Sequence, residues 1–167
     1  YKEFKLRSKP RVDFNFKERF GSYPQSIMKF QYVNDDLRKV CNIINKDENL
    51  CHQKGSLNFG ETQIKLHQMN PQQCEFAIDY YTQPDDLVLD MFNGRGTTGL
   101  TSLHLGRRFI GFHIDEYAYK ETKRVIEDHV ETTPDRWKLY LEDGCEMNSL
   151  KDKSEYVDCI FTSPPYT

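Results

Sequence analysis

Short apolar runs alternate with segments of helical periodicity from residue 67 onward, and this alternation limits the folds open to the chain. The apolar runs span residues 87–90, 109–114, 137–141 and 157–162, and helical spacing covers residues 71–81, 98–105 and 117–129. Strands that alternate with helices are typical of a parallel sheet whose connections cross over it. The sequence therefore predicts a doubly wound, mainly parallel α/β sheet.

Each helical segment presents one face toward this sheet. Pro71 can open the first, because a first turn does not need the missing N–H, and Gly106 is placed to end the second as a C-cap. The inner faces are predicted to carry Cys74, Ala77, Ile78 and Tyr81 in the first segment, and Ala118, Thr122, Val125, Ile126 and His129 in the third. The last apolar run, residues 157–162, is expected to be a buried strand.

Residues 1–66 are polar and irregular, and we expect an N-terminal arm or accessory segment beside a domain of residues 67–167. Met28, Phe30 and Tyr32 alternate as in a short strand, and Leu37, Val40, Cys41 and Ile44 recur at helical spacing behind Asn34 and Asp35. Residues 1–20 hold seven Lys and Arg against three acids, with four Phe between them. Such a segment can follow a phosphate backbone, but taken alone it is better explained as a solvated, partly flexible arm.

Composition narrows the class of protein. Net charge is −3, with 37% hydrophobic and 29% charged residues, and no apolar run approaches the length of a membrane span. Five cysteines without a CxxC pair disfavour a disulfide framework or a metal site. We expect reduced thiols, no metal, no membrane association and a cytoplasmic location in a bacterial, archaeal or phage-encoded protein. The chain does not begin with Met, which favours a processed, trimmed or partial chain.

A glycine-rich loop joins the first predicted strand to its helix. The candidate ligand contacts in it are Asp90, Phe92, Gly94, Gly96, Thr97 and Thr98. Open α/β sheets bind ligands at the carboxyl ends of their strands, where this loop lies. With Gly99 the glycines spell GxGxxG, but an acid at the strand end would repel a pyrophosphate. The same acid would attract the ammonium group of an amino-acid-like ligand.

Acids also follow the next two predicted strands. Asp115 closes the second and could hold ribose hydroxyls, with His113 as a structural or secondary contact. Asp143 and Gly144 follow the third, where Asp143 could accept from an adenine amino group. An acid for an ammonium, one for a ribose and one for an adenine together describe S-adenosylmethionine.

Ser163, Pro164, Pro165 and Tyr166 follow the fourth predicted strand. The prolines lock φ and lack N–H donors, so the Ser163 hydroxyl and the Pro164 carbonyl are free to accept hydrogen bonds beside an aromatic ring. Such a site suits an exocyclic amine on a nucleobase. Taken alone, the tetrapeptide could equally be a rigid surface turn.

Together these motifs resemble the amino-directed DNA methyltransferases, which modify cytosine N4 or adenine N6. The resemblance covers roughly the last hundred residues, through Asp90 to Thr98, residues 105–111 and Ser163 to Tyr166. His67, Pro71 and the helix that follows look like the family motif that caps the methionine end of the cofactor, and residues 23–27 look like the stretch that precedes it.

Three positions depart from the family. Arg95 replaces a small residue, so the loop must turn its side chain outward or use it; His113 replaces an acid, and Asn70 replaces a Lys.

The resemblance implies a Rossmann-like methyltransferase that acts on double-stranded DNA, of the kind found in restriction–modification systems. The target base would be flipped out, stacked on Tyr166, and held through its amine protons by Ser163 and Pro164, without a covalent enzyme intermediate. Serine at the first position favours cytosine N4, because members acting on adenine more often carry Asp or Asn there. The chain ends at the catalytic motif, so we expect the rest of the sheet and target recognition from a continuation or a second chain.

Three alternatives remain open from the sequence. An RNA guanine-N2 or adenine methyltransferase also pairs a polar residue with Pro-Pro-aromatic. A non-catalytic methyltransferase-like subunit is disfavoured by the presence of Asp90 and Asp143. A nucleotide-binding oxidoreductase is disfavoured by the Ser163–Tyr166 motif.

Overall fold

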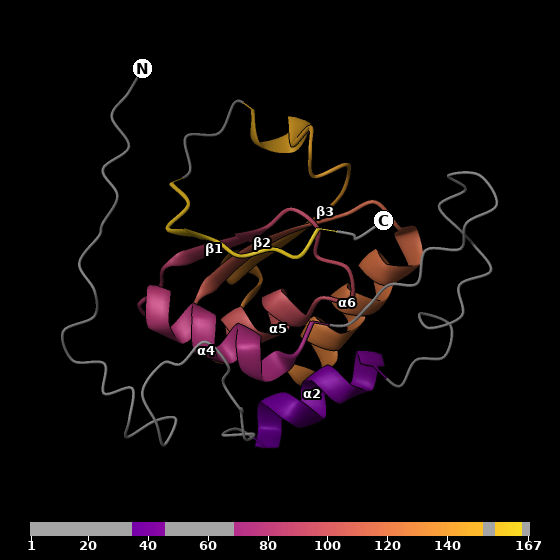
Figure 1. The fold of residues 1–167 in the computed structure, drawn as a ribbon. Coiled ribbons are helices and arrows are strands. Elements are labelled where there is room, and N and C mark those ends of the chain that lie inside the picture. Colours follow the sequence, from indigo (N-terminus) through magenta and orange to yellow (C-terminus); the bar gives the residue numbers. More distant parts are fainter. Residues whose placement is uncertain (1–34, 46–68, 152–155, 165–167) are drawn as a thin grey trace.

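The computed structural model describes residues 35–45, 69–151 and 156–164 (Figure 1). In chain order the elements are α2 (Asp35–Asn45), α4 (Pro71–Tyr81), β1 (Leu87–Asp90), α5 (Thr97–His104), β2 (Arg108–His113), α6 (Glu116–His129), the 3-10 turn η1 (Pro134–Arg136), β3 (Trp137–Leu141), the 3-10 turn η2 (Asn148–Leu150) and β4 (Cys159–Ile160). The strands and helices expected between residues 71 and 141 are confirmed, with ends that differ by one residue at most.

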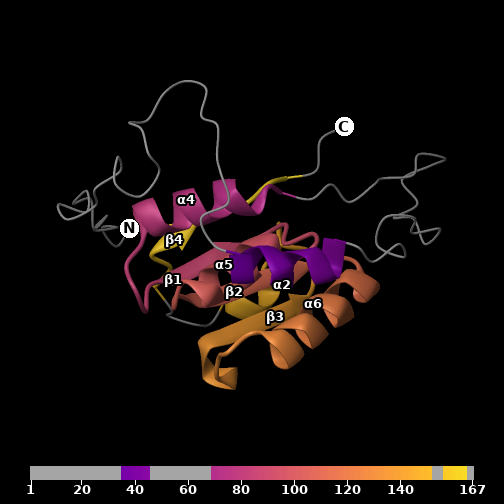
Figure 2. The same cartoon turned by 90° about the horizontal axis from the view of Figure 1, so that it is seen from below.

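All four strands are parallel and follow the order β3-β2-β1-β4. The central pair is in register from Leu87 opposite Arg108 to Asp90 opposite Gly111. β4 lies on the other side of β1, with Val88 opposite Cys159 (Figure 2). The prediction that the fourth strand lies beside the first is therefore confirmed, and the fold is a Rossmann-like parallel α/β fold.

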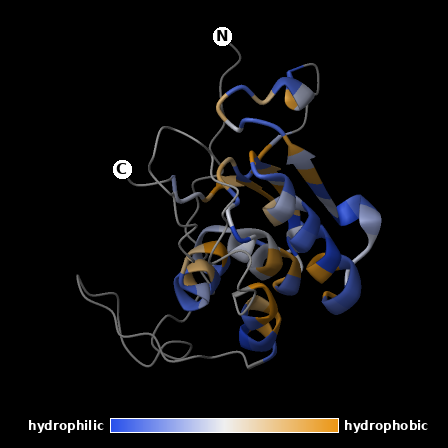
Figure 3. Ribbon diagram, turned by 90° about the vertical axis from the view of Figure 1, so that its right-hand side faces the viewer, coloured by the Kyte–Doolittle hydropathy of each residue, from blue (hydrophilic) through white to orange (hydrophobic). Residues whose placement is uncertain are grey.

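α4, α5 and α6 lie on one face of the sheet, and α2 packs on these helices from the side away from the strands, as Figures 1 and 2 show. Their buried side chains and the sheet side chains that meet them make the main core, which includes Ile78, Val88, Leu100, Phe109 and Val125. The opposite face of the sheet carries a second cluster, formed by Leu87, Leu89, Ile110 and Phe112 with Met147 and Leu150 beside η2. Figure 3 shows hydrophobic colour on the strands and mixed colour on the helices, as expected for amphipathic helices. No helix in the described ranges is both long and apolar enough to span a membrane.

α2 belongs to this core although it lies far upstream in the sequence. Leu37, Cys41 and Ile44 are buried, and α2 packs against α4, α5 and α6. The helical spacing seen in the sequence is therefore confirmed. The division of the chain at residue 66 stays a prediction, and the short strand expected around Phe30 lies outside the described residues.

Two side chains predicted on inner helix faces are exposed instead. Tyr81 is 71% exposed and His129 is also exposed. Each is the last residue of its helix, where the chain leaves the layer that packs on the sheet. The helical periodicity of the sequence thus continues one residue beyond the buried face at both places. The other predicted inner-face residues Cys74, Ile78, Ala118, Thr122, Val125 and Ile126 are buried as expected.

The expected buried strand over residues 157–162 is wrong in length and in burial. Regular pairing covers Cys159 and Ile160 only, and Ile160 is 59% exposed. Among the described residues β4 has a single neighbour, β1, so one of its sides is open. An apolar run alone does not distinguish an edge strand from a central one.

A buried ion pair joins α4 to the start of β2. Nη2 of Arg107 lies 3.1 Å from Oδ1 of Asp79, and both side chains are 4% exposed. The Arg107 guanidinium also donates to the Thr82 carbonyl at 2.9 Å and to its hydroxyl at 3.0 Å. Removing one partner of such a pair leaves an uncompensated buried charge.

We expect Arg107→Met to lower the free energy of unfolding by about 3–5 kcal/mol, because Asp79 loses its counter-charge in the core. Urea denaturation followed by circular dichroism measures the change. Lys120→Gln is the matched control, since the pair of Lys120 with Glu116 is about two-thirds exposed and is worth at most about 1 kcal/mol. Equal losses of unfolding free energy in the two variants would contradict a stabilising role for the buried Arg107–Asp79 pair.

Candidate functional site

The carboxyl ends of β1, β2 and β3 converge on one edge of the sheet. The Asn93 N–H donates to the Phe112 carbonyl at 3.1 Å, and the Glu142 N–H donates to the His113 carbonyl at 2.8 Å. A Cβ placed on Gly144 would lie 2.0 Å from the Met91 carbonyl oxygen. The loops after β1 and β3 are therefore in direct backbone contact, and only glycine permits that approach.

Residues 91–96 form the loop that links β1 to α5. Gly94 and Gly96 have φ of 45° and 76°, and Gly96 is the N-cap of α5. A Cβ on Gly96 would lie 2.6 Å from Cγ2 of Thr122 on α6. This loop thus turns in the left-handed region while it packs tightly on α6. Thr97 and Thr98 begin the helix and are buried.

Asp90 is a buried carboxylate at the end of the central strand, only 1% exposed. Its Oδ1 accepts from the Thr162 hydroxyl at 2.6 Å and from the Phe92 N–H at 3.0 Å. Burial raises the pKa of Asp90, and hydrogen bonds from Thr162, Thr98 and the Phe92 N–H lower it. The carboxylate is held in place, and its hydrogen bonds replace part of the water that it loses on burial.

The contact of Asp90 with Thr162 brings two predicted motifs together. These residues are 72 positions apart, and Thr162 comes directly before Ser163. Ser163 is half-buried and Pro164 is exposed. Pro165 and Tyr166 lie outside the described residues, so their predicted roles stay predictions.

His113 is buried at the end of β2, and the amide of Asn93 contacts it. Nδ2 of Asn93 lies 2.8 Å from Nε2 of His113; with the amide as donor, Nε2 accepts and the ring proton sits on Nδ1. Burial lowers the pKa of His113 to about 4, against smaller raising effects of Asp115 and the Gly94 backbone. The imidazole is therefore neutral at pH 7. Within the described residues, Oδ1 of Asn93 is buried without a hydrogen-bond partner, whereas the His113 ring also interacts with the Gly94 backbone.

Asp115 and Asp143 are engaged in local turns. Oδ1 of Asp115 accepts from the Ala118 N–H at 2.7 Å and caps α6. Oδ1 of Asp143 accepts from the Cys145 N–H at 2.9 Å, and the residue is exposed. The loops of both acids reach the same sheet edge as Asp90, but no described contact joins the three carboxylates.

Two of the departures from the family pattern have a visible structural outcome. The Arg95 side chain is buried, with 8% exposure, so the loop does not turn it outward. Asn70 is the N-cap of α4, and its side chain accepts from the Gln72 N–H at 2.9 Å. Asn is a favoured N-cap residue, which accounts for its presence before Pro71.

Sequence reasoning missed Asn93 and Thr162. Asn93 is a polar residue between Phe92 and Gly94 in the glycine-rich loop, and Thr162 is the hydroxyl residue immediately before Ser163. Their positions beside the predicted contacts were visible in the sequence. Their partners, His113 and Asp90, were not, because both bonds join distant segments.

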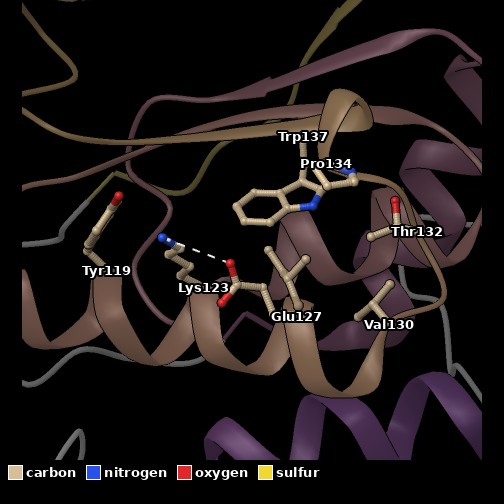
Figure 4. Close-up of a pocket in the computed structure, with 8 residues that line it drawn as sticks. Tyr119, Lys123, Glu127, Val130, Thr132, Pro134 and Trp137 are labelled. Carbon is tan, nitrogen blue, oxygen red and sulfur yellow. Dashed lines mark ion pairs between the residues drawn. The ribbon is translucent and has the colours of Figure 1, made fainter.

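A pocket of about 340 Å³ lies away from this edge, between α6, η1 and β3. Tyr119, Lys123, Glu127, Val130, Thr132, Pro134 and Trp137 surround it (Figure 4). Lys123 and Glu127 are paired across one helical turn at 3.9 Å. Of these residues, Tyr119 also contacts the candidate site. Its ring is edge-on to the His113 ring, with 6.1 Å between the two ring centroids. The pocket holds none of the predicted site residues.

The neutral state of His113 predicts a loss of stability in acid. In the unfolded chain the imidazole protonates near pH 6.5, whereas in the folded chain it does so near pH 4. As pH falls through this window the unfolded state gains the proton first, so the free energy of unfolding falls by about 3 kcal/mol. Chemical denaturation of wild type and His113→Gln between pH 7 and pH 4 measures this. His129→Gln is the control at an exposed histidine, and an unchanged pH dependence in His113→Gln would contradict the prediction.

A protein-family comparison matches part of the site just described. The model of the DNA methylase family N6_N4_Mtase matches residues 23–124, more than half of the chain, and includes Asp90, Gly96 and His113. S-adenosylmethionine is the methyl donor of this family.

Curated relatives and a solved structure are similar to part of the chain. The type II methyltransferase M.PvuII of Proteus hauseri is 39% identical over 80 residues, 46% of this chain and 24% of that protein. M.BglII of Bacillus subtilis, also a type II methyltransferase, is 30% identical over 105 residues, 60% of this chain and 28% of that protein. A putative transferase of Pyrococcus horikoshii superposes with a TM-score of 0.40 at 22% identity, over 52% of this chain and 34% of that chain.

The chain thus spans about a quarter of the length of these curated relatives. The family match nevertheless covers the β1 end, the glycine-rich loop and the β2 end, whereas the β3 loop and the Thr162–Pro164 segment lie outside the matched residues. The chain belongs to the DNA methylase family of N6 and N4 amino-methyltransferases.

Proposed function

We propose that the protein transfers a methyl group from S-adenosylmethionine to an exocyclic amine of a flipped base in double-stranded DNA, and that the base is cytosine, modified at N4. The observation that carries the proposal is the hydrogen bond between Asp90 and Thr162. It places the residue before Ser163 against the end of the strand that opens the cofactor loop.

The residues at the sheet edge fit the cofactor. Asp90 offers a buried carboxylate for the ammonium of the methionine part. Oδ1 of Asn93 offers a hydrogen-bond acceptor that lacks a partner among the described residues, which suits a ribose hydroxyl. Asp143 and Gly144 form the edge on which the adenine would rest. Asp115 supports this arrangement by capping α6.

The chain's own groups would bind and orient the amine. S-adenosylmethionine supplies a methyl group activated by its sulfonium. The Ser163 hydroxyl and the Pro164 carbonyl accept hydrogen bonds from the two amine protons and keep the nitrogen lone pair directed at the cofactor. The methylated amine then loses one of these protons to solvent. Tyr166 stacks on the flipped base, a contact worth about 1–3 kcal/mol in similar sites. This is catalysis by position and electrostatics, without a covalent intermediate.

Cytosine is preferred to adenine because Ser163 leads the catalytic motif, a choice that rests on the family resemblance. The relatives named above are type II methyltransferases, which supports a place in a restriction–modification system.

The test uses the full-length protein with S-adenosylmethionine and unmethylated DNA of mixed sequence, digested to nucleosides and read by mass spectrometry. We expect N4-methylcytosine. Ser163→Ala should lower the methyl-transfer rate on the order of 100-fold with little change in cofactor affinity, because one amine-proton acceptor is lost. Asp90→Ala should weaken cofactor binding on the order of 100-fold, because the ammonium loses its counter-charge.

Asp128→Asn, at an exposed acid on α6, is the control and should change neither quantity. N6-methyladenine would keep the mechanism and overturn the choice of base. Cofactor binding without any methylated DNA base would redirect the proposal to an RNA substrate. No cofactor binding in the wild type would leave a non-catalytic subunit as the better reading.

A further inference from the structure

The Thr162 hydroxyl occupies the junction between the two halves of the site. It donates to Oδ1 of Asp90 at 2.6 Å and accepts from the Phe92 N–H at 3.3 Å. Phe92 N–H also reaches Oδ1 of Asp90 at 3.0 Å, so the hydroxyl, the carboxylate and the loop backbone form a closed triangle. One side chain thus contacts both the acid and the start of the cofactor loop.

The backbone reaches this junction with little other support. The last ladder bond between β4 and β1 runs from the Phe161 N–H to the Leu89 carbonyl, at 3.0 Å. Regular pairing has already ended at Ile160, which is largely exposed. In the described part of the chain, the bonds of Thr162 are the last that tie the segment before Ser163 to β1 and its loop.

We propose that Thr162 is a positioning residue that couples the two halves of the site: its hydroxyl orients Asp90 for the cofactor and fixes the position from which Ser163 and Pro164 meet the amine. The inference rests on the proposed function and adds to it a residue without predicted contact to cofactor or base. It requires a hydroxyl at residue 162, because only that group both donates to the carboxylate and accepts from the Phe92 N–H.

The groups around Asp90 support an effect on its charge. Thr162 and Thr98 on α5 lower its pKa against the effect of burial. Cys74 on α4 is the titratable side chain that faces it, and burial raises the pKa of that thiol, so it is neutral. Loss of the Thr162 hydroxyl should therefore let Asp90 take up a proton at higher pH, and cofactor binding should weaken first on the acid side.

The test compares Thr162→Val, which keeps the shape and loses the hydroxyl, with Thr162→Ser, which keeps the hydroxyl. Calorimetry of the full-length protein gives the Kd for S-adenosylmethionine at pH 6 and pH 8, and single-turnover assays give the methyl-transfer rate. We expect Thr162→Val to raise the Kd about tenfold at pH 6, less at pH 8, and to slow transfer about tenfold. Thr162→Ser should stay within about threefold of wild type in both.

A double-mutant cycle tests whether Thr162 acts through Asp90. Asp90→Asn combined with Thr162→Val should bind the cofactor no more weakly than Asp90→Asn alone. The matched control is Thr101→Val, which removes a buried threonine hydroxyl bonded to the Thr97 carbonyl within α5 and should leave Kd and rate unchanged. Thermal unfolding of each variant shows whether it is still folded, so that a misplaced Asp90 or Ser163 is distinguished from an unfolded protein.

Several results would overturn the inference. Wild-type Kd and rate in folded Thr162→Val would show that the hydroxyl is not needed. Equal losses in Thr162→Val and Thr162→Ser would show that packing, not the hydroxyl, matters. Additive losses in the cycle would show that Thr162 does not act through Asp90. A wild-type protein that binds no cofactor or methylates no base would overturn the proposed function itself. The wild-type measurements alone distinguish this outcome from a failure of the Thr162 inference.

Discussion

A carboxylate buried at the end of the central strand is costly unless hydrogen bonds replace its water, and the arrangement of this site follows from how Asp90 meets that requirement. Its donors come from the strand's own loop, through the Phe92 N–H, and from the far segment, through Thr162. The second donor exists only because β4 pairs in parallel with β1. One of the bonds that satisfy the acid thus also brings the Ser163 motif to the glycine-rich loop.

Tight backbone contacts hold the rest of the edge around this acid. Gly96 packs against Thr122, and Gly144 packs against Met91, at distances that no side chain would tolerate. The two contacts join the β1 loop to α6 and to the β3 loop. The edge is therefore a preformed surface, as sites that act by positioning require.

The second feature of the edge is a neutral pair where the family often carries an acid. His113 stays uncharged because it is buried, and Asn93 determines which of its nitrogens carries the proton. The pair offers both a donor and an acceptor, whereas a carboxylate offers acceptors alone. The replacement at residue 113 thus changes the type of hydrogen bonding available without adding a buried charge.

Local pattern was enough to find most elements. Pro71 and the Cys74–Ile78 spacing located α4, and the apolar runs located β1, β2 and β3 within one residue. Local pattern failed where burial or strand length depends on neighbouring elements of the fold. Tyr81 and His129 continue a helical face but lie beyond the layer that would cover them. Residues 157–162 are apolar enough for a buried strand, yet β4 is short and open on one side in the described sheet.

By itself the sequence determined the fold class, the glycine-rich loop, the acids at the strand ends and the family, because periodicity and motif spacing are local properties of the chain. Only the tertiary structure decided the partners of Asp90, His113 and Arg107. Each of those bonds joins segments 20 to 72 positions apart. Strand order brings such segments together, and a hydrogen bond then forms according to distance in space, which residue spacing does not encode.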